Sequence, residues 1–268
     1  MSLMRRVDEA RKGYATGDQT LSAHAHSPER IAQAAVEEHG GAAQQYIGDM
    51  VYGGLDGIVT TFAIVSGVAG AKLGSSVILV LGLANLLADG FSMATGAYLS
   101  TKSDQEYFDR ERERERWEVD HYPEGEKAEL LEVYRNRGYD PEDASALVEI
   151  HSRNPDRWVE AMMFDELGMI KDDRKPTRSA LATFIAFLIA GSVPLLVFLL
   201  GLVVPIPAQT AFWVSLVLSG VALFLLGAAK VLVTKRSLFR SGLETLLIGG
   251  LAAGVAFAVG ALLEGLVD

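Results

Sequence analysis

Residues 53–67 read GGLDGIVTTFAIVSG, and this stretch decides the class of fold. It lies inside an apolar run from Met50 to Ala71 in which Asp56 is the one formally charged residue. A membrane-spanning helix needs about 20 predominantly apolar residues, so the run is long enough to cross a bilayer. An acidic residue in such a helix costs about 2.5–3.5 kcal/mol on insertion scales, which indicates that Asp56 is retained for a function.

The rest of the chain repeats this apolar pattern. Of its 268 residues, 50% are hydrophobic, and the mean hydropathy is +0.23, which is high for a soluble domain of this length. Runs long enough to span a bilayer lie near residues 50–71, 75–100, 179–202, 209–232 and 243–264. We therefore predict an all-α, polytopic membrane protein with five transmembrane helices.

The apolar runs also predict the domain organisation. It consists of a polar leader over residues 1–46, two transmembrane helices over 47–100, a polar helical domain over 101–178 and three further transmembrane helices over 179–268. In the leader, Ser27-Pro28 predicts a helix start and Gly40-Gly41 a stop, and we expect disorder before residue 27. The chain opens without the apolar stretch of a secretory signal.

The basic residues predict the topology. In a five-span arrangement, all of the 24 Lys and Arg residues except Lys72 fall on one side of the membrane. Because cytoplasmic loops are enriched in these residues, the N-terminus and residues 101–178 are expected in the cytoplasm. The membrane is expected to be the plasma (inner) membrane of a bacterium rather than that of an organelle. The net charge of −10 argues against nucleic acid as a partner, and the absence of cysteine excludes thiolate metal sites.

The second apolar run also carries polar residues. Asn85, Asp89 and Met93 are spaced by four, so they form one stripe on a helix. Together with Asp56 they suggest a polar pathway whose carboxylate and thioether ligands suit a borderline divalent ion better than Mg²⁺ or Ca²⁺. The alternative is that Asp56 only hydrogen-bonds a neighbouring helix and fixes packing, as the Gly53/Gly57 spacing does by allowing close approach.

The polar domain is predicted to be a set of helices with clustered glutamates. A charged helix over 103–121 is broken at Pro123 and Gly125, a second follows over about 126–137, and two more start at Asp140-Pro141 and Asn154-Pro155, the last ending at Gly168. Two Glu-x-x-Glu pairs, Glu115/Glu118 and Glu126/Glu129, flank one turn, so a folded-back hairpin would bring four carboxylates together. The alternative is a solvated hairpin, because ERERER forms ion pairs without any ligand.

Several of these segments resemble the vacuolar iron transporter family. The resemblance is carried by DGIVTTFAIVSGVAGA, ADGFSMATGAYLSTKSDQEY, the paired Glu-x-x-Glu motifs and MMFDELGM, and it covers residues 44–265. It implies a homodimer whose ion path follows the dimer axis, lined by the first two transmembrane helices. It also implies export of cytosolic Fe²⁺ in exchange for protons.

The resemblance also implies the site residues. The ligands of the polar domain would be Glu115, Glu118, Glu126, Glu129 and Glu166, with Met162 and Met163 close by. In the membrane, Asp56 and Met93 match the family's pathway residues. Asn85 departs from the family pattern, since this position is often acidic in plant members, and Asp89 lies one turn further on.

Two other classes of function stay open beside an iron exporter. One is a metal sensor that does not transport, which would explain the glutamates but not Asp56, Asn85, Asp89 and Met93, and the other is an enzyme. Within transport, Mn²⁺ is the rival substrate, because carboxylate-rich sites hold both ions. An enzyme of the di-iron carboxylate kind needs Glu-x-x-His on each of two helices, and Glu118 to His121 is the one such spacing in the polar domain. We therefore expect no catalytic activity and no permanently bound cofactor, with the metal ion and protons as the substrates.

Overall fold

The computed structural model describes residues 3–34, 46–229 and 237–266, and every regular element in these ranges is a helix. The all-α fold predicted from the sequence is confirmed. The chain divides into two units, residues 1–47 and 48–268. The first unit contains the polar leader, and the second contains the apolar helices together with the polar helical domain.

The described part of the leader, residues 3–34, forms three short helices. They are α1 (Leu3–Thr16), α2 (Gln19–Ala25) and α3 (Pro28–Ala34). Asp18 caps α2 by accepting hydrogen bonds from backbone N–H groups of the first turn, and Arg30 bonds Glu9 at 2.7 Å. The helix start predicted at Ser27-Pro28 is confirmed, whereas the disorder predicted before it is wrong, because α1 and α2 occupy that segment. The stop predicted at Gly40-Gly41 lies outside the described residues.

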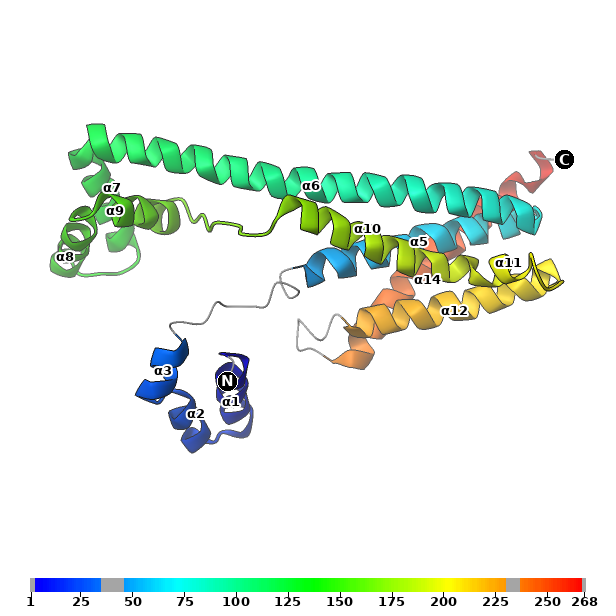
Figure 1. The fold of residues 1–268 in the computed structure, drawn as a ribbon, viewed down its shortest axis with the longest axis horizontal. Coiled ribbons are helices and arrows are strands. Elements are labelled where there is room, and N and C mark those ends of the chain that lie inside the picture. Colours follow the sequence, from blue (N-terminus) through cyan, green and yellow to red (C-terminus); the bar gives the residue numbers. More distant parts are fainter. Residues whose placement is uncertain (1–2, 35–45, 230–236, 267–268) are drawn as a thin grey trace. The chain divides into compact units, whose positions relative to one another are not determined.

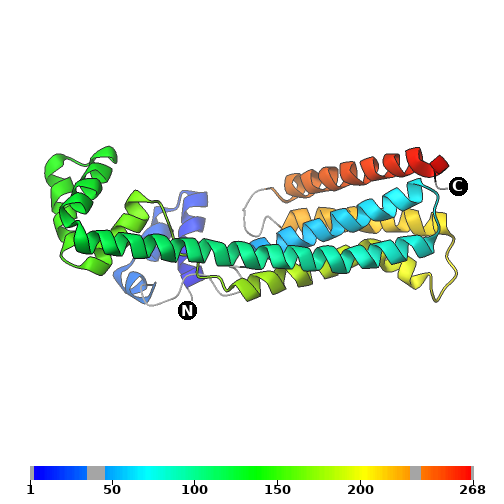
Figure 2. The same ribbon diagram turned by 90° about the horizontal axis from the view of Figure 1, so that it is seen from above.

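Within the described residues of the second unit, five helical segments are long and apolar enough to cross a membrane. They are α5 (Ile47–Gly70), α6 (Ser75–His121), the helix pair α10 (Pro176–Ser192) and α11 (Leu196–Leu200), α12 (Ala208–Ala229) and α14 (Leu238–Leu263). The protein is therefore a multi-pass membrane protein with five candidate spans, as predicted. Figures 1 and 2 show these helices packed side by side.

The third span is interrupted, which the sequence analysis did not predict. Proline has no backbone N–H and cannot complete the helical hydrogen bonds of the preceding turn. Around Pro194 the chain forms the 3-10 turn η2 (Val193–Leu195) between α10 and α11. A second 3-10 turn, η3 (Glu264–Leu266), follows α14.

Glycines let α5 lie directly against α10. A Cβ atom at Gly57 would stand 2.5 Å from the carbonyl oxygen of Phe187, and one at Gly53 would stand 2.5 Å from the carbonyl oxygen of Thr183. No side chain fits at either position, so this Gly-x-x-x-Gly spacing serves close helix packing. The contact fixes the rotation of α5 about its axis, and with it the side of the helix on which Asp56 lies.

Helix α6 joins the membrane bundle to the polar domain without a break. Its 47 residues correspond to about 70 Å of helix, more than twice the roughly 30 Å of a bilayer's hydrocarbon core. Figures 1 and 2 show α6 running past the ends of the other long helices. The charged helix predicted from residue 103 is therefore the continuation of the second span, and the domain boundary predicted at residues 100 and 101 falls inside one helix.

The polar domain packs against the far part of α6. It comprises α7 (Pro123–Asn136), α8 (Pro141–Ser152), α9 (Pro155–Ala161) and the π-helical turn η1 (Met162–Glu166). The start of α7 lies three residues before the predicted one, because Pro123 occupies its first turn instead of ending a loop. Leu130 and Val159 are fully buried in the core that joins these helices to Val119 of α6.

Candidate metal centre and membrane pathway

The turn between α6 and α7 brings the two Glu-x-x-Glu pairs together. Helix α6 ends at His121, Tyr122 caps it, and α7 begins at Pro123. One carboxylate oxygen from each of Glu115, Glu118 and Glu126 lies within 4.8 Å of the other two. These three side chains come from both arms of the hairpin and form the centre of the site.

Two further glutamates adjoin this centre. Glu166 of η1 interacts electrostatically with Glu115, and it shares a hydrogen bond with Glu129. We call the five residues Glu115, Glu118, Glu126, Glu129 and Glu166 the Glu cluster. All the glutamates that the sequence pointed to are thus neighbours in the folded domain.

The carboxylates of the Glu cluster differ in exposure. Glu115 is 1% exposed and Glu126 is 4% exposed, whereas Glu129 lies at the surface. Among the described residues, one oxygen each of Glu126 and Glu166 is buried without a hydrogen-bond partner, and the buried Oε1 of Glu115 forms an ion pair with Arg114. A buried carboxylate oxygen left unpaired is costly unless a cation or a proton compensates it. Freely solvated ion pairs, the alternative reading of this hairpin, do not account for these buried oxygens.

The burial of the Glu cluster changes the acidity of its members. Burial, reinforced by the charges of Glu115 and Glu129, raises the pKa of Glu126 to about 8. Burial and the charge of Glu115 likewise raise the pKa of Glu166 to about 7. The pKa of Glu115 is raised too, mainly by burial, while Arg114 opposes the shift. These carboxyl groups therefore keep their protons to a higher pH than ordinary glutamates do.

Arg114 is a member of the site that the sequence analysis did not single out. Its guanidinium lies 2.5 Å from carboxylate oxygens of both Glu115 and Glu118, and 3.1 Å from Glu111. The only signal in the sequence was the ERERER repeat, which looks like any solvated charged helix. Arg114 supplies one positive charge where three carboxylates meet, so it offsets part of their repulsion.

The π-helical turn η1 presents Glu166 together with two methionines. Met162 and Met163 are buried in the hydrophobic core of the domain, where packing is sufficient to explain them. Asp165 anchors the turn to α7, because it accepts a hydrogen bond of 3.0 Å from the Tyr134 hydroxyl and pairs with Arg137. This anchor, which the sequence did not reveal, fixes the turn that carries Glu166.

The predicted pathway residues lie on α5 and on the membrane part of α6. Asp56 and Asp89 are partly buried, and they are close enough for their charges to repel each other. The side-chain nitrogen of Asn85 is buried and has no hydrogen-bond partner among the described residues. Met93 packs against the core cluster that contains Leu86 and Phe187. We call Asp56, Asn85, Asp89 and Met93 the membrane stripe.

Asp49, two turns before Asp56 on α5, is tied to the segment that connects the polar domain to α10. Its carboxylate accepts hydrogen bonds from Arg174 at 3.2 Å and from the Ser179 hydroxyl at 2.5 Å. Gln105 of α6 donates to backbone oxygens of the same segment. No spacing in the sequence predicts these contacts, since the partners of Asp49 lie more than a hundred residues away.

Comparison with known proteins places this architecture in one family. The model of the VIT family matches residues 47–261, which include the polar domain and all five candidate spans apart from the last two residues of the fifth. The chain belongs to the VIT family. The resemblance read from the sequence motifs is thereby confirmed.

Curated relatives extend over nearly the whole chain. A protein of Toxoplasma gondii named vacuolar iron transporter is 36% identical over 270 residues, which cover 97% of this chain and 89% of the relative. Vacuolar iron transporter 1 of Arabidopsis thaliana is 36% identical over 219 residues, which cover 81% of this chain and 86% of the relative. The vacuolar iron transporter of Plasmodium falciparum is 33% identical over 266 residues, covering 97% of each chain.

Proposed function

We propose that this protein exports Fe²⁺ from the cytoplasm in exchange for protons. The observation that carries the proposal is the continuity of α6, because one helix bears Glu115 and Glu118 outside the bundle and Asp89 within its membrane part. The names of the VIT family relatives, vacuolar iron transporters, support iron as the transported metal.

In this proposal the Glu cluster collects the ion from solution. Carboxylate oxygens are suitable ligands for Fe²⁺ and Mn²⁺, and a thioether favours such borderline ions over harder ones. Glu166 follows Met162 and Met163 on the same turn, so both kinds of ligand come from one element. Because Glu126 and Glu166 have raised pKa values, a bound ion would displace protons from them.

The membrane stripe then passes the ion through the bundle. Asp56 and Asp89 repel each other when both are charged, so an ion or a proton between them stabilises the pair. Since metal and protons compete for the same oxygens, ion movement in one direction is coupled to proton movement in the other. Met93 adds a soft ligand on the same stripe as Asp89.

The proposal also covers the orientation of the protein in the membrane and its assembly into a dimer. The distribution of Lys and Arg favours a cytoplasmic N-terminus and a cytoplasmic polar domain, in the plasma (inner) membrane. A homodimer is proposed because Asp56 and Asp89 remain partly exposed in one copy. A carboxylate facing lipid is unfavourable, so a second copy that covers them would complete the path.

The proposal is tested by Fe²⁺ flux into proteoliposomes, with and without an imposed proton gradient, for the wild type and Asp56→Ala. We expect gradient-dependent flux in the wild type and none in Asp56→Ala, while both proteins bind Fe²⁺ at the Glu cluster. Binding without flux in the wild type would instead indicate a metal sensor. Competition by Mn²⁺ in the same assay distinguishes the two candidate substrates.

A measurement of oxygen consumption separates transport from catalysis. A di-iron oxidase would need His121 as a ligand beside Glu118, but the His121 ring stacks on Trp117 with 4.5 Å between centroids, and its Nδ1 lies 2.8 Å from the Trp117 carbonyl oxygen. His121 is also exposed. These contacts support transport over oxidation, and consumption of oxygen by the Fe²⁺-loaded protein would contradict the proposal.

A further inference from the structure

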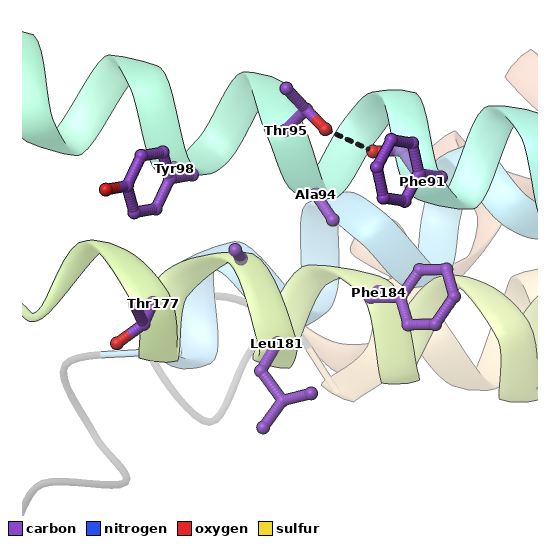
Figure 3. A pocket seen from close by; sticks show the side chains of 8 residues that line it. Phe91, Ala94, Thr95, Tyr98, Thr177, Leu181 and Phe184 are labelled. Atoms are coloured by element: carbon purple, nitrogen blue, oxygen red, sulfur yellow. Dashed lines mark hydrogen bonds between the residues drawn. The ribbon is translucent and has the colours of Figure 1, made fainter.

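A cleft of about 420 Å³ lies between α6 and α10, near the end of the bundle from which the polar domain extends. Figure 3 shows the two helices side by side with the cleft between them. Its lining consists of Phe91, Ala94, Thr95 and Tyr98 from α6 and Thr177, Ala180, Leu181 and Phe184 from α10. The cleft is open at the surface, since Phe91 is 70% exposed and Leu181 is 57% exposed.

This cleft is separate from the membrane stripe. Successive residues of an α-helix are rotated by about 100°, so Phe91 and Tyr98 fall on the side of α6 opposite Asp89. The cleft is also bordered by α10, whereas the stripe includes Asp56 of α5. A ligand held here would not enter the proposed ion path.

Two contacts border the cleft, one between α6 and α10 and one between α6 and the segment that precedes α10. At one end the helices touch at Gly90, where an added Cβ would lie 3.2 Å from the rings of both Phe184 and Phe187. Beyond the other end, the Gln105 side chain donates hydrogen bonds of 2.8 and 2.6 Å to the backbone oxygens of Asp172 and Arg174. The space between these two contacts is an elongated groove, and the contacts hold its walls in place at both ends.

The groove has an apolar end and a polar end. Figure 3 shows the rings of Phe91 and Phe184 at one end, and the side chains of Tyr98 and Thr177 at the other. The Thr95 hydroxyl bonds the Phe91 carbonyl oxygen at 2.9 Å, so its donor is satisfied within α6. Tyrosine is enriched at the level of lipid headgroups, and Tyr98 stands near the end of the apolar run of this helix. The groove therefore fits an amphipathic molecule.

Two basic residues flank the polar end. Lys102 follows Tyr98 by four residues on the same face of α6, and its side chain is 48% exposed. Its ion pair with Glu106 spans 3.5 Å at the surface. Because such exposed pairs are weak, the Lys102 ammonium can also interact with a bound anion. Arg178, next to Thr177, is exposed and forms no ion pair within the described part of the chain. Positive charge at this level attracts an anionic headgroup.

We propose that the groove between α6 and α10 binds one anionic phospholipid. One acyl chain lies between the rings of Phe91 and Phe184, and the phosphate lies near Lys102 and Arg178. The lipid bridges the helix that carries the Glu cluster and the helix that follows the polar domain, so it holds α6 and α10 together at the membrane surface. This binding does not depend on which metal the protein moves or on whether it moves one.

The test is lipid binding to the full-length protein in detergent, measured by native mass spectrometry. The probes are phosphatidylglycerol and phosphatidylcholine with identical acyl chains. We expect one phosphatidylglycerol molecule to be retained in preference to phosphatidylcholine. Lys102→Gln and Arg178→Gln should each weaken phosphatidylglycerol binding about fivefold, which corresponds to about 1 kcal/mol per basic residue near a membrane surface.

Two further variants separate a specific site from general attraction of lipid. Ala94→Phe places a ring in the groove and should reduce retention of both lipids, whereas Arg240→Gln removes an exposed arginine from the start of α14 and should change neither. The proposal is overturned by equal retention of the two lipids in the wild type. It is also overturned if Arg240→Gln weakens binding as much as Lys102→Gln does. Should Ala94→Phe fail to fold, the three charge variants still decide the outcome.

Discussion

The Glu cluster and the membrane stripe both group carboxylates, but they compensate the negative charge differently. In the Glu cluster, Arg114 lies against two of the carboxylates, and the pKa of Glu126 is raised to about 8. The negative charge is therefore offset partly by the guanidinium and partly by bound protons. In the membrane stripe, the negative charges of Asp56 and Asp89 repel each other, and neither aspartate forms an ion pair with a basic residue in the described ranges. The first arrangement suits holding an ion in exchange with solution, and the second suits passing one on.

The largest effect is expected when the two aspartates of the membrane stripe are neutralised. Asp56→Asn should lower Fe²⁺ flux by more than the roughly 10- to 100-fold loss that outer-shell changes cause, because it removes a carboxylate that we propose as a direct ligand. The Asp89→Asn variant should also show a lower Fe²⁺ flux than the wild type. If the two aspartates act as one site, the double variant is no worse than Asp56→Asn alone. Flux measurements on this double-mutant cycle check the prediction, and additive losses would show two independent sites.

A substitution in the Glu cluster should reduce metal affinity more than it reduces the transport rate. Glu126→Gln removes a buried carboxylate that we propose as a ligand, so we expect Mn²⁺ or Fe²⁺ affinity of the full-length protein to fall by about 10- to 100-fold. Flux at saturating metal should fall less, because the membrane stripe is intact. Glu132→Gln is the matched control on α7, since Glu132 is exposed. Titration calorimetry measures the affinity, and an equal loss in the control would remove Glu126 from the site.

The raised pKa values predict opposite pH trends for metal binding and for stability without metal. The folded protein protonates Glu126 with a pKa of about 8, compared with an ordinary value of 4.5. Between these values the folded state binds more protons than the unfolded state, so the free energy of unfolding without metal falls as pH rises. Metal affinity should rise over the same interval, by about tenfold per pH unit for each displaced proton.

Thermal unfolding and calorimetry between pH 6 and 8 check both trends. Glu126→Gln should flatten them, because glutamine carries no titrating proton. A metal affinity that stays constant over this interval would mean that the ion binds without displacing protons from the Glu cluster.

The smallest effect is expected for Arg114. Its ion pair with Glu118 is partly exposed, and exposed pairs contribute about 0.2–1 kcal/mol each. The buried Glu115, whose pKa is raised by burial, can take up a proton when its pair with Arg114 is lost. Arg114→Gln should therefore lower the melting temperature only slightly without metal. The rise in melting temperature on adding Mn²⁺ should be larger than in the wild type, because the ion then neutralises the carboxylates unaided. Lys127→Gln, which breaks an exposed pair with Glu124, is the control, and an identical response in both variants would contradict the role given to Arg114.

Much of the architecture follows from local patterns in the sequence. Each span is recognisable by its own length of apolar residues, since a bilayer imposes the same requirement on every helix. The 4-residue and 3-residue spacings place Glu115 with Glu118, and Asn85 with Asp89, on common helix faces. These properties depend on a single helix, so they can be predicted without knowing what packs against it.

Other features depend on which elements meet, and only the tertiary structure decided them. The spacing of the glutamates cannot distinguish buried Glu126 from exposed Glu129, because burial requires the neighbouring helices to cover one of them. The same holds for Tyr134 against Asp165 and for Arg174 against Asp49, contacts between residues 31 and 125 positions apart in the sequence. A sequence determines where a side chain lies on its own helix, whereas its environment, and therefore its pKa and its partners, is set by the helices that surround it.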